Sequence, residues 1–144
     1  MSPTGEIPAD TIARTRLPVR AVVTAGGVET EYLRVGVGRP ILLVTLDPTL
    51  AAGLDALAES LAPHGRVIVP LAPAPPDVPM RNAWLGDFLD GVGFTPSRLV
   101  VIGASEALAS GVARTVGVTD RDLLWLASDT LPDAAAVVRF ITAA

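Results

Sequence analysis

Residues 84–108 of this 144-residue chain are WLGDFLDGVGFTPSRLVVIGASEAL, and this stretch decides the fold. Apolar side chains recur at helical spacing at its start, which predicts a helix over 81–92. The continuous apolar run 99–102 is typical of a strand buried on both faces of a parallel sheet. Small residues at 103–105 form a tight turn into a second, alanine-rich helix predicted over 105–116. A buried strand between two helices predicts an α/β protein.

Strand–helix units repeat on both sides of this stretch. The predicted buried strands span 41–46, 66–71, 99–102 and 122–127, and the predicted helices span 50–62, 81–92, 105–116 and 131–141. Residues 72–79 contain four prolines and are predicted to form a loop. The alternation of strands and helices predicts right-handed crossovers and a parallel sheet covered on both faces.

Two segments of alternating apolar and polar residues, 17–24 and 28–35, precede these units and flank a turn that contains Gly26 and Gly27. This pattern predicts a β-hairpin. Residues 1–18 mix proline, glycine, threonine and charged residues and are expected to form an extended arm. The organisation expected is therefore an arm followed by a single α/β domain over residues 19–144.

The composition excludes several classes of protein. Half of the residues are hydrophobic, which is enough for one core, but no apolar run approaches the roughly 20 residues of a membrane span. Cysteine is absent, and the start of the chain lacks the pattern of a secretory signal. The net charge is −4 and all eleven basic residues are scattered arginines, a poor match to nucleic acid. We expect a cytoplasmic protein without a cofactor, nucleic-acid partner or membrane contact.

Over residues 20–129, this order of elements resembles the N-terminal part of the α/β-hydrolase family. The segment VETEYLRVGVGRPILLVTL at 28–46 is similar to the second and third strands of that family. The segment LAPHGRVIVPLAP at 61–73 is similar to its fourth strand and the loop that follows. The resemblance implies a truncated three-layer sandwich, with an N-terminal β-hairpin followed by four parallel strands and helices on both faces.

The stretch from Gly103 to Ala107, GASEA, corresponds to the nucleophile turn of the family, G-x-S-x-G, with alanine in place of the second glycine. The resemblance implies that Ser105 occupies the place of the nucleophile. An ordinary strand-to-helix turn explains the same residues, because serine is favoured as the N-cap of a helix. The sequence leaves both interpretations open.

The partners of a nucleophilic serine are missing or altered. A serine hydrolase needs a base, yet His64 is the one histidine and precedes the strand 66–71. We expect it at the opposite end of the sheet from Ser105, roughly 16 Å away. The family places its histidine after later strands, which lie past the end of this sequence, and Asp129 is the best candidate acid.

Carboxylates occupy the positions where the family stabilises an oxyanion. The first position falls on Thr45-Leu46-Asp47 and the second on Glu106, and negative charge there opposes a developing oxyanion. A ligand site above the sheet would be outlined by Thr45, Leu46, Asp47, Ser105, Glu106 and Asp129. A Mg²⁺ or Ca²⁺ site made of these carboxylates is an alternative. Helix capping by Asp47 and Asp129 explains them better, and no metal is expected.

The last predicted strand has an uncharged sequence that would leave an open sheet edge. Such an edge pairs readily with another chain. We expect a homodimer formed through this strand together with the C-terminal helix, although a different partner chain remains an alternative. The residues of the expected interface strand are Leu123, Leu124, Trp125 and Leu126.

Three functions are compatible with these features. The first is a catalytically silent protein that acts in binding or assembly. The second is a serine ester or thioester hydrolase with Ser105 as its nucleophile and a base supplied by another chain. The third is a small-ligand binder that uses the region above Ser105. The absent base and the acidic oxyanion side favour the first.

Overall fold

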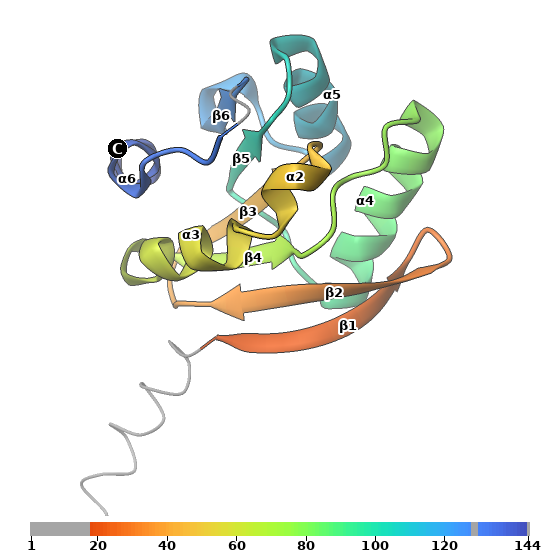
Figure 1. Cartoon of the computed structure of the whole chain (residues 1–144), viewed down its shortest axis with the longest axis horizontal. Helices are drawn as coiled ribbons and strands as arrows, with labels where there is room; N and C mark the ends of the chain where they lie inside the picture. Colours follow the sequence, from red (N-terminus) through yellow and green to blue (C-terminus); the bar gives the residue numbers. More distant parts are fainter. Residues whose placement is uncertain (1–17, 128–129, 144) are drawn as a thin grey trace, which may run out of the picture.

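The computed structural model describes residues 18–127 and 130–143. These residues form one sheet and the helices that cover both of its faces (Figure 1). The predicted arm therefore lies outside the described residues, apart from Pro18. The sheet has six strands in the order β1-β2-β4-β3-β5-β6. The strands are β1 (Val19–Ala25), β2 (Val28–Val35), β3 (Pro40–Thr45), β4 (Arg66–Pro70), β5 (Arg98–Ile102) and β6 (Leu123–Leu126).

The helices divide between the two faces of this sheet. One face packs against α4 and α5, and the other packs against α2, α3 and α6. The helices are α2 (Pro48–Ala51), α3 (Leu54–Leu61), α4 (Val78–Val92), α5 (Glu106–Val116) and α6 (Ala134–Thr142), with short 3-10 helices η1 (Ala62–His64) and η2 (Asp120–Asp122). This arrangement confirms the predicted three-layer α/β architecture. No helix in the described ranges has the length and apolar character needed to cross a bilayer.

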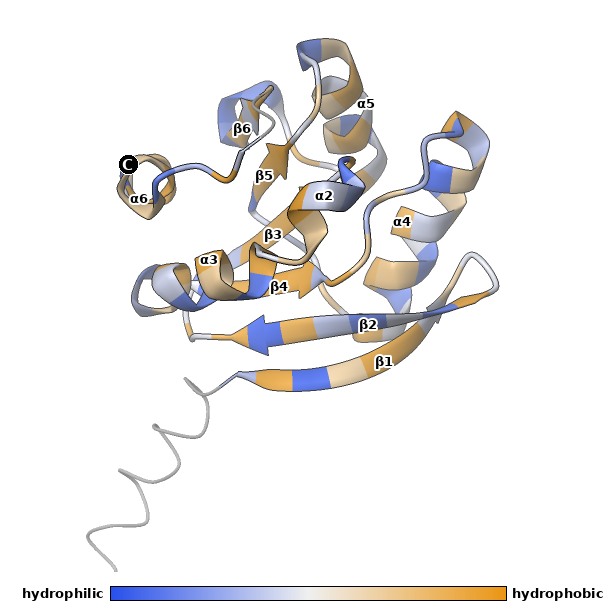
Figure 2. Cartoon of the chain, viewed as in Figure 1, coloured by the Kyte–Doolittle hydropathy of each residue, from blue (hydrophilic) through white to orange (hydrophobic). Residues whose placement is uncertain are grey.

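Strand pairing confirms the predicted hairpin and the four parallel strands. β1 pairs with β2, and β2 with β4, in antiparallel orientation, whereas β3, β4, β5 and β6 are parallel to one another. The hairpin turns at Gly26 and Gly27, whose φ angles of 57° and 79° favour glycine. Hydrophilic and hydrophobic residues are mixed along β1 and β2 (Figure 2), and more exposed residues alternate with more buried ones over much of both strands, because part of the hairpin has one face in solvent.

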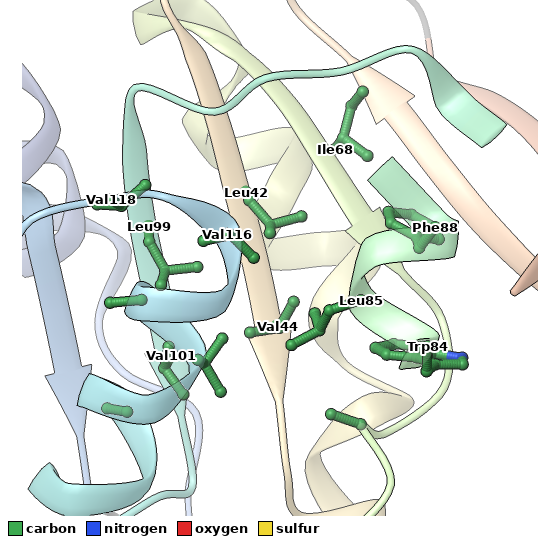
Figure 3. Close-up of a cluster of buried hydrophobic side chains, with 14 of the residues drawn as sticks. Leu42, Val44, Ile68, Trp84, Leu85, Phe88, Leu99, Val101, Val116 and Val118 are labelled. Atoms are coloured by element: carbon green, nitrogen blue, oxygen red, sulfur yellow. The ribbon is translucent and has the colours of Figure 1, made fainter. Parts of the chain in front are cut away.

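The central strands explain the continuous apolar runs in the sequence. Leu42 and Val44 of β3 lie beside Leu99 and Val101 of β5 in the cluster under α4 and α5 (Figure 3). The intervening residues of the same strands face the opposite cluster, under α2, α3 and α6. Both faces of β3 and β5 are therefore buried, as strand alternation in a covered parallel sheet requires.

The structure corrects several predicted boundaries; α6, for example, begins at Ala134 and not at 131. The helix predicted over 50–62 is interrupted at Gly53, where an added Cβ would lie 2.3 Å from Leu131 Cδ1, so the glycine permits the segment before α6 to approach. The loop predicted over 72–79 is shorter, because α4 begins at Val78. Asp77 accepts a hydrogen bond from Met80 N and caps this helix. Proline in the first turn is compatible with a helix, since the N–H groups there need no intrahelical acceptor.

Candidate functional site

Ser105 lies between β5 and α5 and caps the helix. Its hydroxyl oxygen accepts a hydrogen bond from Leu108 N at 3.3 Å, and its carbonyl accepts one from Ala109 N at 2.9 Å. The side chain is exposed, and the backbone has an extended conformation with φ −69° and ψ 166°. This is the geometry of a serine N-cap. The N-cap interpretation of the sequence is therefore confirmed as a structural role of this residue.

The turn that holds Ser105 places its unusual backbone conformation on a glycine. A nucleophile elbow holds its serine in a strained strand-to-helix turn. Here the positive φ, 74°, belongs to Gly103, and no described non-glycine residue has a positive φ. A Cβ on Gly103 would lie 2.8 Å from Asp47 Cβ and 3.3 Å from Thr45 Oγ1. The glycine thus lets the turn after β5 approach the turn after β3.

The turn after β3 brings Thr45 and Asp47 into one hydrogen-bond network. The buried Thr45 hydroxyl donates to Ile102 O at 2.8 Å and accepts from Asp47 N at 3.0 Å. Asp47 Oδ1 accepts from Thr49 N at 2.9 Å and from Thr49 Oγ1 at 2.8 Å, so this carboxylate caps α2 as predicted. Leu46 is partly buried against the cluster under α4 and α5. Three of the predicted site residues therefore adjoin the Gly103 turn.

Glu106 is the remaining acidic candidate among the described residues, and it is not part of a cluster. Glu106 is exposed in the first turn of α5 and makes no hydrogen bond or ion pair with another described residue. Asp129 lies outside the described residues. Within residues 18–127 and 130–143, no group of three or more histidine, cysteine or acidic side chains is arranged to hold a metal ion.

His64 lies at the opposite end of the sheet from Ser105, as the sequence predicts. It is exposed at the end of η1, just before β4 begins. The register pairs the first residue of β4 with the start of β3, and Thr45 at the end of β3 with Ile102 at the end of β5. Ser105 follows that far end. His64 of one chain is therefore not placed to accept the proton of its own Ser105.

Sequence analysis missed two buried arginines. Arg98, at the start of β5, donates from Nη2 to Ala143 O at 2.7 Å and from Nη1 to Phe140 O. Its Nε lies 3.6 Å from Asp122 Oδ1, and its guanidinium lies 5.3 Å from the centroid of the Phe140 ring. These contacts bind the end of α6 to the sheet.

The second is Arg81 of α4, with only 3% of its surface exposed. Its Nη1 donates to Pro76 O at 3.2 Å, but its buried Nε has no hydrogen-bond partner. Arg81 shares the buried face of α4 with Trp84 and Leu85. The sequence contains a signal for this burial: Arg81 lies three residues before Trp84 and four before Leu85, so helical spacing puts it on the same apolar face.

Neither protein-family models nor curated proteins match this chain. Solved structures do match. A laboratory-evolved variant of potato epoxide hydrolase aligns with a TM-score of 0.59 and 16% identity, over 76% of this chain and 39% of that one. A mutant of the Vigna radiata epoxide hydrolase aligns with a TM-score of 0.57 and 16% identity, over 79% of this chain and 40% of that one. A haloalkane dehalogenase from Agrobacterium tumefaciens aligns with a TM-score of 0.54 and 16% identity, over 76% of this chain and 41% of that one.

The chain has the α/β-hydrolase fold. It spans about two fifths of the length of these solved structures, the coverage expected for their N-terminal part. The likeness, at this identity, establishes the fold and leaves function to the residues of the chain itself.

Proposed function

We propose that this chain is a catalytically silent protein of the α/β-hydrolase fold that acts in binding or assembly. The observation that carries the proposal is the role of Ser105, whose hydroxyl caps α5 from a relaxed backbone conformation. A serine in this position serves the helix, because its oxygen satisfies an N–H group that would otherwise lack a partner.

The surroundings of Ser105 support the same conclusion. A nucleophilic serine transfers its proton to a base, and the chain's one histidine lies at the other end of the sheet. Asp47 and Glu106 add negative charge at both positions that correspond to oxyanion donors. Negative charge there raises the energy of a tetrahedral oxyanion, which an active site must lower.

Labelling with a fluorophosphonate tests whether Ser105 is reactive. We expect no more labelling of the wild-type chain than of the Ser105→Ala variant, with an active serine hydrolase labelled in parallel as the positive control. The Ser105→Asn variant keeps a capping side chain and should retain the wild-type stability, whereas Ser105→Ala should lose about 1 kcal/mol. Stoichiometric labelling that disappears in Ser105→Ala would contradict the proposal. Labelling that appears only in an assembly with another chain would instead favour a hydrolase whose base comes from that chain.

We further propose that assembly joins two copies of the chain through β6. Among the described residues this strand pairs only with β5, and its sequence carries no charge. Trp125 on this strand is 36% exposed. An uncharged edge strand with free backbone groups favours pairing with another strand.

The geometry of β6 supports a symmetric pair. Leu126 O accepts a hydrogen bond from Gly103 N at 2.8 Å, so it faces the β5 side. Backbone groups alternate in direction along a strand, so those of Trp125 face the free edge. An antiparallel pair centred on Trp125 would therefore bring the two indole rings onto the same face at the two-fold axis.

Sedimentation tests this assembly. The wild-type chain should be dimeric at micromolar concentration, and Trp125→Lys should be monomeric because charge on an edge strand opposes pairing. Trp125→Phe, which keeps an apolar ring, should remain largely dimeric. Circular dichroism establishes that each variant is folded. A monomeric wild-type chain, or a dimer that is unchanged in folded Trp125→Lys, would refute this interface.

A further inference from the structure

Arg81 is a buried cation without a counter-charge. No carboxylate of the described residues lies within ion-pair distance of it, although only 3% of its surface is exposed. An arginine side chain does not lose its proton in proteins, so burial leaves a full charge in a poorly solvated place. A buried charge without a partner is costly, and its presence in a folded protein needs an explanation.

The unused donors of Arg81 lie on one edge of its guanidinium. Nη1 is occupied, because it donates to Pro76 O at 3.2 Å. Nε is buried and has no partner. Nη2 is not among the fully buried unpartnered atoms and makes no hydrogen bond within the described part of the chain. In a guanidinium, Nε–H and one N–H of Nη2 point in the same direction. These two donors match the spacing of two oxygens of a carboxylate or a phosphate.

The position of Arg81 also suits an anion. It lies in the first turns of the 15-residue helix α4, and Nη1 contacts Pro76, just before the N-cap Asp77. The positive end of a helix dipole favours negative charge. α4 follows the carboxyl end of β4, and ligands of open α/β sheets bind beyond the carboxyl ends of strands.

Asp77 is the charged group closest along the chain. Its Oδ2 accepts a hydrogen bond from Met80 N at 3.1 Å, and it makes no ion pair with Arg81. The carboxylate is thus engaged with the helix backbone. Pro79 has no N–H and Met80 N donates to Asp77, so neither of these positions offers a free backbone donor at this helix end.

We propose that Arg81, at the N-terminus of α4, binds a small oxyanion, a carboxylate or a phosphate, through Nε and Nη2. This site depends neither on the reactivity of Ser105 nor on pairing through β6.

An NMR titration tests the site in the wild-type chain. The Nε–H resonance of Arg81, assigned by its disappearance in Arg81→Lys, should shift in a saturable manner when inorganic phosphate or succinate is added. The Nε–H resonance of Arg98 is the internal control, because that group faces Asp122, and it should not move. The probe that saturates at the lower concentration identifies the preferred oxyanion. Absence of an Arg81 shift with both probes up to about 50 mM would overturn the proposal.

Thermal unfolding gives a second, independent readout. Phosphate should raise the Tm of the wild-type chain with the logarithm of its concentration once that exceeds the Kd, by roughly 10 °C at about 100 times the Kd. The matched variant Arg114→Gln, which removes an exposed arginine of α5, should respond like the wild type. Arg81→Met should show only the gradual stabilisation that phosphate gives to proteins in general. An equal response of Arg81→Met and the wild type would overturn the proposal.

Discussion

Two buried arginines at opposite ends of the sheet have opposite surroundings. Arg98 begins β5, is 8% exposed, and directs its guanidinium to two carbonyls, a carboxylate and an aromatic ring. Arg81 lies past the carboxyl end of β4, is 3% exposed, and contacts a single carbonyl, that of Pro76. The two side chains carry the same charge and have similar burial, so the difference lies in their partners.

This difference separates a structural charge from a binding charge. The last carbonyls of a helix lack intrahelical donors, and Arg98 supplies donors at the end of α6 while also reaching Asp122 of η2. Its interactions are completed within the chain and stabilise the fold. Arg81 has no comparable set of partners among the described residues, and this lack is the basis of the oxyanion site proposed above.

The largest effect is expected for Arg98→Met. This change leaves the carbonyls of Phe140 and Ala143 without their donor, and it should lower the free energy of unfolding by about 3 kcal/mol. Urea denaturation measures the loss, with Arg114→Met as the control for removing an exposed arginine. A stability equal to that of the control would show that Arg98 does not hold α6 in place.

A change of opposite sign is expected for Arg81→Met. In buffer without phosphate or carboxylates, replacing an unpaired buried charge with an apolar side chain should raise the free energy of unfolding by about 1 kcal/mol. The same urea experiment measures it. A loss as large as that of Arg98→Met would mean that Arg81 is as important to the fold as Arg98, and the contrast between the two would disappear.

The smallest effect is expected for Asp122→Asn. The Asp122 side chain is 37% exposed and its oxygen lies 3.6 Å from Arg98 Nε, so solvent weakens this ion pair. The substitution should cost about 0.3 kcal/mol at low salt and less at high salt. Unfolding at two salt concentrations checks this. A loss above about 1 kcal/mol would show that the ion pair, rather than the two carbonyls, dominates the role of Arg98.

The fold could be predicted because its signals are local. Continuous apolar runs predicted the covered parallel strands, and Gly26-Gly27 between alternating segments predicted the hairpin. The interruption at Gly53 was not predictable, because Leu50, Leu54 and Leu57 keep helical spacing across it. At the break, Gly53 lies so close to Leu131 that a side chain would not fit, and this contact joins segments far apart in the sequence.

In the candidate site, too, the features with a local sequence signal could be predicted, and those that depend on distant contacts could not. Capping by Ser105 and Asp47 follows from the preference of these residue types at helix starts, so the sequence contained it. Arg81 and Arg98 were missed because arginine is usually exposed, and only the tertiary structure shows which arginines are buried. The two carbonyls that accept hydrogen bonds from Arg98 lie 42 and 45 residues away, and no local pattern connects them to it.

The strand order has a consequence for synthesis on the ribosome. β3 lies between β4 and β5, both of which come later in the chain. Its apolar residues, Ile41 to Val44, therefore emerge without either neighbour, and β5 is complete only after Ile102 has been made. During this interval the nascent chain presents an unpaired apolar strand, which makes it prone to aggregation. Growing chains should accordingly depend on chaperones most strongly before β5 is available.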